Sequence, residues 1–129
     1  MSEPPLIAIV DDDEAMREAL SDLLEVAGFS ARAFDGADAF LAEYAATPFD
    51  LLVTDIRMPG IDGIELQARL RALGSPIPVV FVTSASDAAT RGRAHEGGAF
   101  AYLTKPISDE FLLHLIHAAL GRDDELPRG

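Results

Sequence analysis

Polar side chains that could carry out phosphoryl chemistry stand at the ends of four apolar segments of the sequence. Asp11 and Asp12 follow the first of these segments, Asp55 and Lys105 follow two others, and Thr83 ends a fourth. Carboxylates that are brought together repel one another unless a cation joins them, and Mg²⁺ takes oxygen ligands of this kind. With such an ion in place, an aspartate can attack a phosphoryl donor and hold the group as an aspartyl phosphate. We therefore expect Asp55 to be a phosphoryl acceptor beside a Mg²⁺ site.

Lys105 and Thr83 could supply the other groups that this chemistry needs. Phosphoryl transfer depends on positioning and charge neutralisation more than on covalent work by the protein. An ammonium is a compact positive charge, and a threonine hydroxyl can donate a hydrogen bond to phosphoryl oxygens. Lys105 is the single lysine among ten basic residues, since the other nine are arginines. A specific role for this ammonium explains why a lysine stands there.

The segments that must position these residues alternate between strand and helix patterns. Residues 51–54 are apolar or β-branched, as in a strand buried on both faces, and Asp55 follows them directly. Further strands are predicted at 6–10, 30–34, 79–83 and 100–104, the second of them a weaker edge strand. Helices are predicted from the acidic turn at 11–14 to Gly28, and at 38–46, 64–73, 88–96 and 109–120. This alternation predicts an α/β fold with a parallel sheet, whose strand ends meet at one rim.

The composition fits one globular domain and excludes several classes of site. The chain has 129 residues, and its lack of cysteine excludes disulfides, thiol catalysis and cysteine-ligated zinc. A net charge of −12 without a basic run argues against direct binding of nucleic acid. There is no apolar run of membrane-spanning length and no signal-peptide pattern at the start, so we expect a cytoplasmic protein without membrane association.

Four motifs, in this order, resemble the receiver domain of two-component response regulators, in the CheY-like superfamily. They are Val10-Asp11-Asp12, Thr54-Asp55-Ile56-Arg57-Met58-Pro59, Val82-Thr83-Ser84 and Tyr102-Leu103-Thr104-Lys105-Pro106. The run from Asp55 to Leu66 is most similar to the FixJ-like subgroup, whose members often carry a DNA-binding output domain. The resemblance implies a flavodoxin-like (βα)5 three-layer sandwich with its strands in the order 2-1-3-4-5. We expect a tail at 1–5, the receiver domain at 6–121, and at 122–129 an acidic tail or the start of a linker.

The resemblance also implies the parts of the phosphorylation site. Asp55 would accept phosphate from a sensor histidine kinase or a phosphotransfer protein. Mg²⁺ would be held directly by Asp12 and Asp55, mainly through water by Asp11, and by the backbone carbonyl of Arg57. Lys105 would pair with the phosphate. Such a domain is a signalling switch and not a metabolic enzyme, because it catalyses only its own phosphorylation and dephosphorylation.

A response to phosphate is implied as well. Thr83 would swing toward the phosphoryl group, Tyr102 would turn inward, and the bond between Lys105 and Pro106 would be cis. The output surface would comprise the fourth helix, the fifth strand and the last helix, where it could bind a second copy of the chain or an effector. We expect the helix at 88–96 to be the least firmly packed, because it is poor in large apolar residues.

The residues alone leave other interpretations open. The acidic run 11–13 could be a helix N-cap, Thr83 could cap the following helix, and Tyr102 could be an ordinary sheet residue. A haloacid-dehalogenase-type phosphatase would need an acid two residues after the nucleophile, where Arg57 stands, and an FMN-binding flavodoxin-like protein would need a phosphate cradle in the acidic first loop. A pseudo-receiver that is never phosphorylated is a further alternative. The histidines at 95, 114 and 117 are expected at the surface or its boundary.

Overall fold

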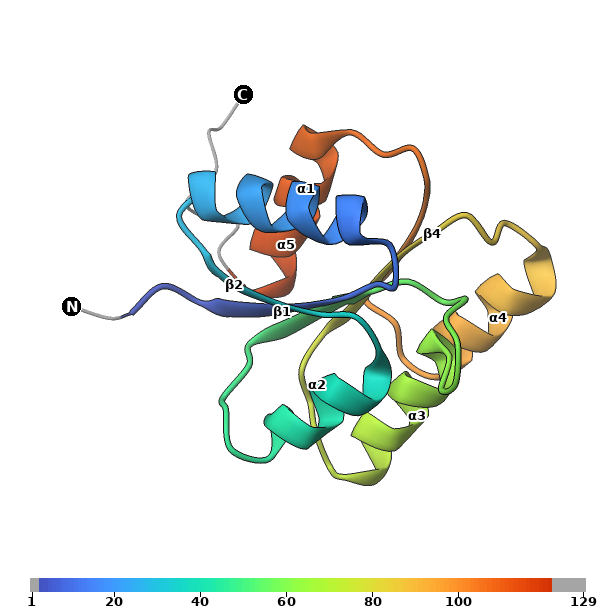
Figure 1. The fold of residues 1–129 in the computed structure, drawn as a ribbon. Coiled ribbons are helices and arrows are strands. Elements are labelled where there is room, and N and C mark those ends of the chain that lie inside the picture. Colours follow the sequence, from blue (N-terminus) through green and yellow to red (C-terminus); the bar gives the residue numbers. More distant parts are fainter. Residues whose placement is uncertain (1–2, 122–129) are drawn as a thin grey trace.

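The computed structural model describes residues 3–121, so the predicted tail at 122–129 and the first two residues lie outside the described part. Five strands alternate with five helices along the chain (Figure 1). The strands are β1 Leu6–Val10, β2 Ser30–Phe34, β3 Leu51–Thr54, β4 Val79–Thr83 and β5 Ala101–Thr104. The helices are α1 Glu14–Val26, α2 Ala37–Tyr44, α3 Gly63–Ala72, α4 Ala88–Glu96 and α5 Asp109–Ala119. Every predicted element is present, with its ends shifted by at most a few residues.

The strands form one parallel sheet in the order β2-β1-β3-β4-β5, which confirms the expected topology. Helices α1 and α5 cover one face of the sheet, and α2, α3 and α4 cover the other (Figure 1). β1, β3 and β4 are almost entirely buried, whereas the edge strand β2 is partly exposed. This difference in burial explains why the sequences of the central strands are continuously apolar, whereas the sequence of β2 gives a weaker strand pattern.

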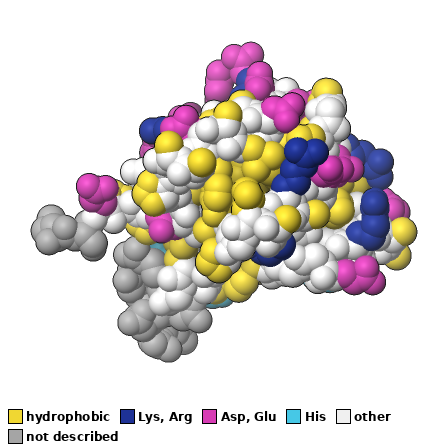
Figure 2. Space-filling view, turned by 90° about the horizontal axis from the view of Figure 1, so that it is seen from below, with side chains coloured by type: hydrophobic (Ala, Val, Ile, Leu, Met, Phe, Trp, Pro, Cys, Tyr) yellow, Lys and Arg dark blue, Asp and Glu magenta, His cyan; other side chains and the backbone are white. Residues whose placement is uncertain are grey.

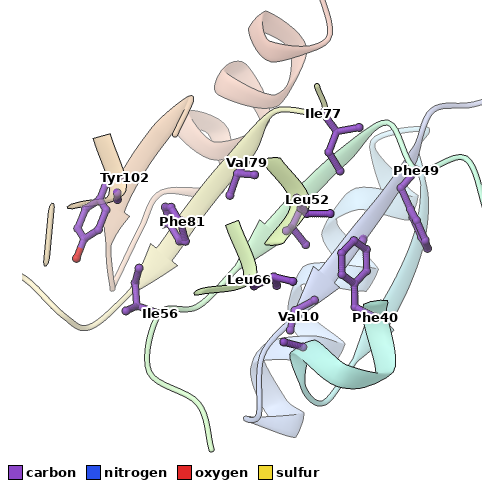
Figure 3. Packing of buried hydrophobic residues seen from close by; sticks show 14 residues of the cluster. Val10, Phe40, Phe49, Leu52, Ile56, Leu66, Ile77, Val79, Phe81 and Tyr102 are labelled. Atoms are coloured by element: carbon purple, nitrogen blue, oxygen red, sulfur yellow. The ribbon is translucent and has the colours of Figure 1, made fainter. Parts of the chain in front are cut away.

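Each face of the sheet has its own apolar core, because side chains alternate between the faces along a strand. Ile7 and Ile9 of β1 pack with Leu24 of α1 and Ile116 of α5. The other core joins strand residues to the helices α2, α3 and α4, and Figure 3 shows part of it. Its labelled side chains are Val10, Phe40, Phe49, Leu52, Ile56, Leu66, Ile77, Val79, Phe81 and Tyr102.

The outer surface over this second core is partly apolar. Figure 2 shows apolar side chains gathered near the middle of the molecule as it is seen from the α2 and α3 side, with charged side chains around them. Leu41, Tyr44 and Ile64 are partly buried and pack against the core beneath. The histidines at 95 and 114 are exposed and His117 is partly buried; His117 also packs against Phe29, with ring centroids 5.1 Å apart.

One packing prediction in α3 is wrong. Helical spacing from Leu66 and Leu70 predicts that Leu73 faces inward, but it is 65% exposed and forms the C-cap of the helix. Leu66 and Gln67 are both buried instead, and Gln67 donates a hydrogen bond to the carbonyl of Ala94 at 3.2 Å. Helical spacing would bring position 73 near the face of position 70, but the helix ends there and the chain turns away at Gly74, where φ is +81°.

Gly63 marks the closest approach between a helix and the strand that carries Asp55. Its N–H donates to the carbonyl of Ile56 at 2.8 Å. A Cβ at position 63 would lie 2.2 Å from the backbone oxygen of Asp55 and 2.9 Å from the Cα of Ile56. Real side chains cannot approach a backbone so closely, so only glycine lets α3 begin directly beside Asp55.

We predict that Gly63→Ala lowers the free energy of unfolding by about 1–3 kcal/mol, because backbone atoms must shift to admit the methyl group. Gly92→Ala, inside α4, is the matched control: a Cβ there meets nothing within 4 Å. That substitution should raise stability by up to about 1 kcal/mol, since alanine is the better helix former. Chemical denaturation of both variants measures the difference, and a neutral Gly63→Ala would contradict the close approach.

Candidate functional site

The sheet register places the predicted site residues together at one rim. Val10 of β1 pairs with Thr54 of β3, so the residues that follow them, Asp11 and Asp55, lie side by side. The N–H of Asp55 donates to the carbonyl of Val10 at 3.0 Å. On the far side of β4, the N–H of Lys105 donates to the carbonyl of Thr83 at 2.8 Å. Ordinary strand pairing therefore brings together residues that are far apart in the sequence.

The carboxylates of Asp11, Asp12 and Asp55 form a group that could hold a metal ion. One oxygen from each lies within 4.8 Å of the others. Asp11 is buried, Asp55 has only 12% of its side chain exposed, and Asp12 is exposed to solvent. An all-oxygen donor set, carrying negative charge and open on one side to water and phosphate oxygens, suits Mg²⁺.

The third acid of the run has a different role. Asp13 is the N-cap of α1, and its Oδ1 accepts hydrogen bonds from the N–H groups of Ala15 at 2.9 Å and Met16 at 3.4 Å. Its own N–H donates to Oδ1 of Asp11 at 2.9 Å. The capping function that the acidic run suggested thus belongs to Asp13, which leaves the carboxylates of Asp11 and Asp12 directed to the rim.

Lys105 faces these acids. Its Nζ lies 3.1 Å from Oδ2 of Asp55 and 3.3 Å from Oδ2 of Asp11. Burial disfavours the charge of this ammonium, but the hydrogen bond and charge of Asp55, with those of Asp11, outweigh it and raise the pKa of Lys105. The ammonium therefore stays protonated between the two carboxylates. The peptide bond to Pro106 is cis, as the resemblance implied.

Asp11 bears the cost of being buried beside another acid. Burial raises the pKa of Asp11, and the charge of Asp55 acts in the same direction; the hydrogen bond from Asp13 and the charge of Lys105 oppose the rise. The guanidinium Nη1 of Arg17 donates a hydrogen bond to the backbone carbonyl of Asp11 at 2.8 Å. Without a metal, this carboxylate is held at the rim at a cost in stability.

Thr83 lies at the wall of the site. Its side chain is fully buried, and its Oγ1 accepts a hydrogen bond from the N–H of Ala85 at 3.1 Å. The hydroxyl still has its own proton to donate. Thr83 lines an open pocket of about 470 Å³ together with Asp55, Arg57 and the loop 84–87. The N-cap of α4 is Asp87 and not Thr83, so the alternative role of Thr83 as a helix cap does not apply.

Tyr102 already lies inward in this structure. It is 6% exposed, its hydroxyl donates to the carbonyl of Ala85, and the guanidinium of Arg91 lies 4.7 Å from its ring centroid. Burial raises the pKa of Tyr102, so the hydroxyl is a donor at neutral pH. This is the inward orientation that the resemblance implied for Tyr102.

An ion pair at the pocket mouth was not predicted from the sequence. Nη2 of Arg57 lies 3.2 Å from Oδ1 of Asp87. The resemblance gave a role to the backbone carbonyl of Arg57 but none to its guanidinium. The two residues are 30 positions apart and belong to separate loops. Opposite charge was the only signal in the sequence, and it fits many other pairs equally well.

Comparison with known proteins identifies the class that this fold and site define. The family model for the response regulator receiver domain matches residues 7–117. The chain therefore belongs to the response regulator receiver domain family. No helix within residues 3–121 has the length and apolar character needed to cross a bilayer.

The predicted likeness to the FixJ-like subgroup is confirmed. The transcriptional regulatory protein FixJ of Bradyrhizobium diazoefficiens is 42% identical over 114 residues, which make up 88% of this chain and 56% of that protein. The response regulator protein TodT of Pseudomonas putida is 38% identical over 115 residues, 89% of this chain and 51% of that protein. The chain thus spans about half the length of these curated relatives.

Solved structures confirm the flavodoxin-like architecture. The crystal structure of FixJ-N superposes with a TM-score of 0.84 at 31% identity, covering 99% of this chain and all of that one (100%). A CheY-like receiver domain protein from Methanospirillum hungatei gives a TM-score of 0.88 at 28% identity, covering 95% of this chain and 98% of that one.

We predict that Asp11→Asn stabilises the metal-free protein at pH 7 by an amount on the order of 1 kcal/mol. Because the pKa of Asp11 is raised on folding, the contribution of Asp11 to the free energy of unfolding is largest below the ordinary carboxyl pKa and is lost as the pH rises through the folded value. The variant cannot ionise, so its advantage should vanish in acid. Thermal unfolding in EDTA at pH 7 and at low pH tests this. Asp12→Asn, at an exposed position, should gain less.

Proposed function

We propose that this receiver domain accepts a phosphoryl group on Asp55 in a Mg²⁺-dependent transfer from a phosphohistidine of a sensor kinase or phosphotransfer protein. The observation that carries this proposal is the position of Lys105, whose Nζ bridges Asp55 and Asp11 at 3.1 and 3.3 Å beside the three-carboxylate group. A cluster of acids that includes a fixed ammonium can neutralise the negative charge that a phosphoryl group brings to the site.

The transfer itself exchanges one bond to phosphorus for another. A carboxylate oxygen of Asp55 attacks the phosphorus, the bond from phosphorus to the imidazole nitrogen breaks, and the imidazole leaves with that electron pair and takes up a proton. Oδ1 of Asp55 accepts a hydrogen bond from the N–H of Ile56 at 2.6 Å, and Oδ2 contacts Lys105. These contacts orient the carboxylate before the donor arrives.

Asp11, Asp12 and Asp55, with the backbone carbonyl of Arg57, would hold the metal. Bound Mg²⁺ would supply charge neutralisation between the carboxylates and the phosphoryl oxygens. Lys105 would follow the new negative charge onto the phosphoryl group, and the hydroxyl of Thr83 would donate to it from the pocket wall. The same site would release the group to water, so the domain acts on itself and has no separate substrate.

The output of this switch would be the surface formed by α4, β5 and α5. Only Thr90 and Ala94 of α4 are buried, which agrees with a helix held loosely enough to respond. Phosphate on Asp55 would bias a two-state equilibrium of this surface toward the form that binds a second copy or an effector. Since the chain spans about half of its FixJ and TodT relatives, an attached output domain is part of this proposal.

Incubation with acetyl phosphate and Mg²⁺, followed by intact mass spectrometry, tests the acceptor. Wild type should gain the mass of one phosphoryl group, and EDTA should prevent the gain. Asp55→Asn should gain nothing, whereas Asp38→Asn, which removes an equal charge from an exposed position on α2, should behave as wild type. Labelling that survives in Asp55→Asn would exclude Asp55 as the acceptor.

Lys105→Met separates the role of the ammonium from that of the metal site. Loss of the charge that meets the phosphoryl oxygens should slow phosphorylation by acetyl phosphate about a hundredfold. The same change removes a cation that competes for Asp11 and Asp55, so the variant should bind Mg²⁺ more tightly than wild type does. Calorimetric Mg²⁺ titration and labelling rates measure the two effects. A parallel loss of both would indicate a damaged site and contradict the assigned role.

A further inference from the structure

The ion pair between Arg57 and Asp87 spans the mouth of the pocket that contains Asp55. Arg57 lies two residues after the acceptor, and Asp87 begins α4. Both side chains line the pocket, and their Nη2 and Oδ1 atoms are 3.2 Å apart. The pair is exposed, with 69% of the Arg57 side chain and 50% of the Asp87 side chain accessible to solvent. A group added to Asp55 would therefore lie in the same pocket as this guanidinium.

Asp87 divides its two oxygens between two tasks. Oδ2 accepts hydrogen bonds from the N–H of Thr90 at 3.0 Å and from its Oγ1 at 2.7 Å, which caps α4. Oδ1 is left for Arg57. The hydrogen bonds from Thr90 are the main cause that lowers the pKa of Asp87, and the nearby Arg57 charge adds to it. The carboxylate thus ties the first turn of α4 to the segment after β3.

The other end of α4 is held differently. Buried Gln67 of α3 donates to the carbonyl of Ala94 at 3.2 Å, and Arg71 donates to the carbonyl of Gly98 at 3.4 Å. A Cβ at Gly97 would lie 2.2 Å from Oε1 of Gln67, so the end of α4 and the side chain of Gln67 on α3 are in close contact there. The C-terminal end of α4 is therefore held by contacts with α3, whereas its N-terminal end combines buried Thr90 with an exposed ion pair that another anion can displace.

We propose that Arg57 is a positioning residue that exchanges Asp87 for the phosphoryl group on Asp55. This inference rests on the proposed function. A phosphoryl group carries more charge than a carboxylate and offers three acceptor oxygens to a planar guanidinium. When Arg57 turns to it, the first turn of α4 loses its tie to the acceptor segment while Gln67 still holds the far end. Arg57 thereby links the charge on Asp55 to the position of α4.

The test is a double-mutant cycle on the affinity for beryllofluoride, a phosphoryl mimic, measured by calorimetry in the presence of Mg²⁺. Asp87→Asn keeps a good helix cap but removes the competing charge, so it should tighten binding by about two- to fivefold. Arg57→Gln should weaken binding by a similar factor. In the Arg57→Gln background, Asp87→Asn should have no effect on beryllofluoride affinity. The guanidinium for which the Asp87 carboxylate and the mimic compete is then no longer present.

Two controls separate this exchange from general effects of charge and helix stability. Asp62→Asn makes the same change at the N-cap of α3, where the carboxylate accepts from the N–H of Glu65 at 2.8 Å; it should leave beryllofluoride affinity as in wild type. Arg57→Lys keeps the positive charge without the planar fork and should restore part of the affinity lost in Arg57→Gln.

Each outcome decides the inference. Tightening by Asp87→Asn that disappears without Arg57 supports the exchange. Equal tightening in both backgrounds, equal tightening by Asp62→Asn, or one affinity for all variants overturns it while leaving the proposed function intact. If wild type binds no beryllofluoride, the proposed function itself fails and the exchange fails with it.

Discussion

The repulsion between the carboxylates of Asp11 and Asp55 is the constraint on which the rest of the site depends. Both follow residues that are paired in neighbouring strands, so neither can move away unless the centre of the sheet opens. Lys105 offsets part of this repulsion from the opposite side. The exposed carboxylate of Asp12 leaves the group with excess negative charge, and a divalent cation is the simplest way to balance it. Strand pairing thus assembles a carboxylate group that could hold a metal ion.

Much of this arrangement could be predicted because it depends on local pattern and on topology. The apolar runs at Leu51–Thr54 and Val79–Thr83 identified central strands, and parallel pairing then required their ends to meet at one rim. The single lysine stood out by composition alone, and its contact with the acids confirms that the choice of residue was informative. The family model that matches residues 7–117 confirms the receiver-domain family that the motifs indicated.

The features that escaped prediction depend on side-chain geometry over long separations. Helical spacing could not show that Leu73 at the end of α3 would be exposed, nor that buried Gln67 would reach across to α4. The resemblance implied that Tyr102 turns inward, but its hydrogen bond to the carbonyl of Ala85 depends on a side-chain conformation that the sequence does not encode locally. The contact of Arg57 with Asp87 joins two exposed residues of separate loops, where periodicity carries no information.

The absence of a side chain at Gly63 divides the surroundings of Asp55 into a rigid half and an adaptable half. Beneath Asp55, α3 starts so close to the backbone that the two must move as one body. On the opposite side, the loop 84–87 and the start of α4 meet the acceptor across open space. A group added to Asp55 would therefore meet resistance at α3 and space on the side of α4. Substitutions on the exposed face of α4 would leave this arrangement intact, whereas a side chain at position 63 would not.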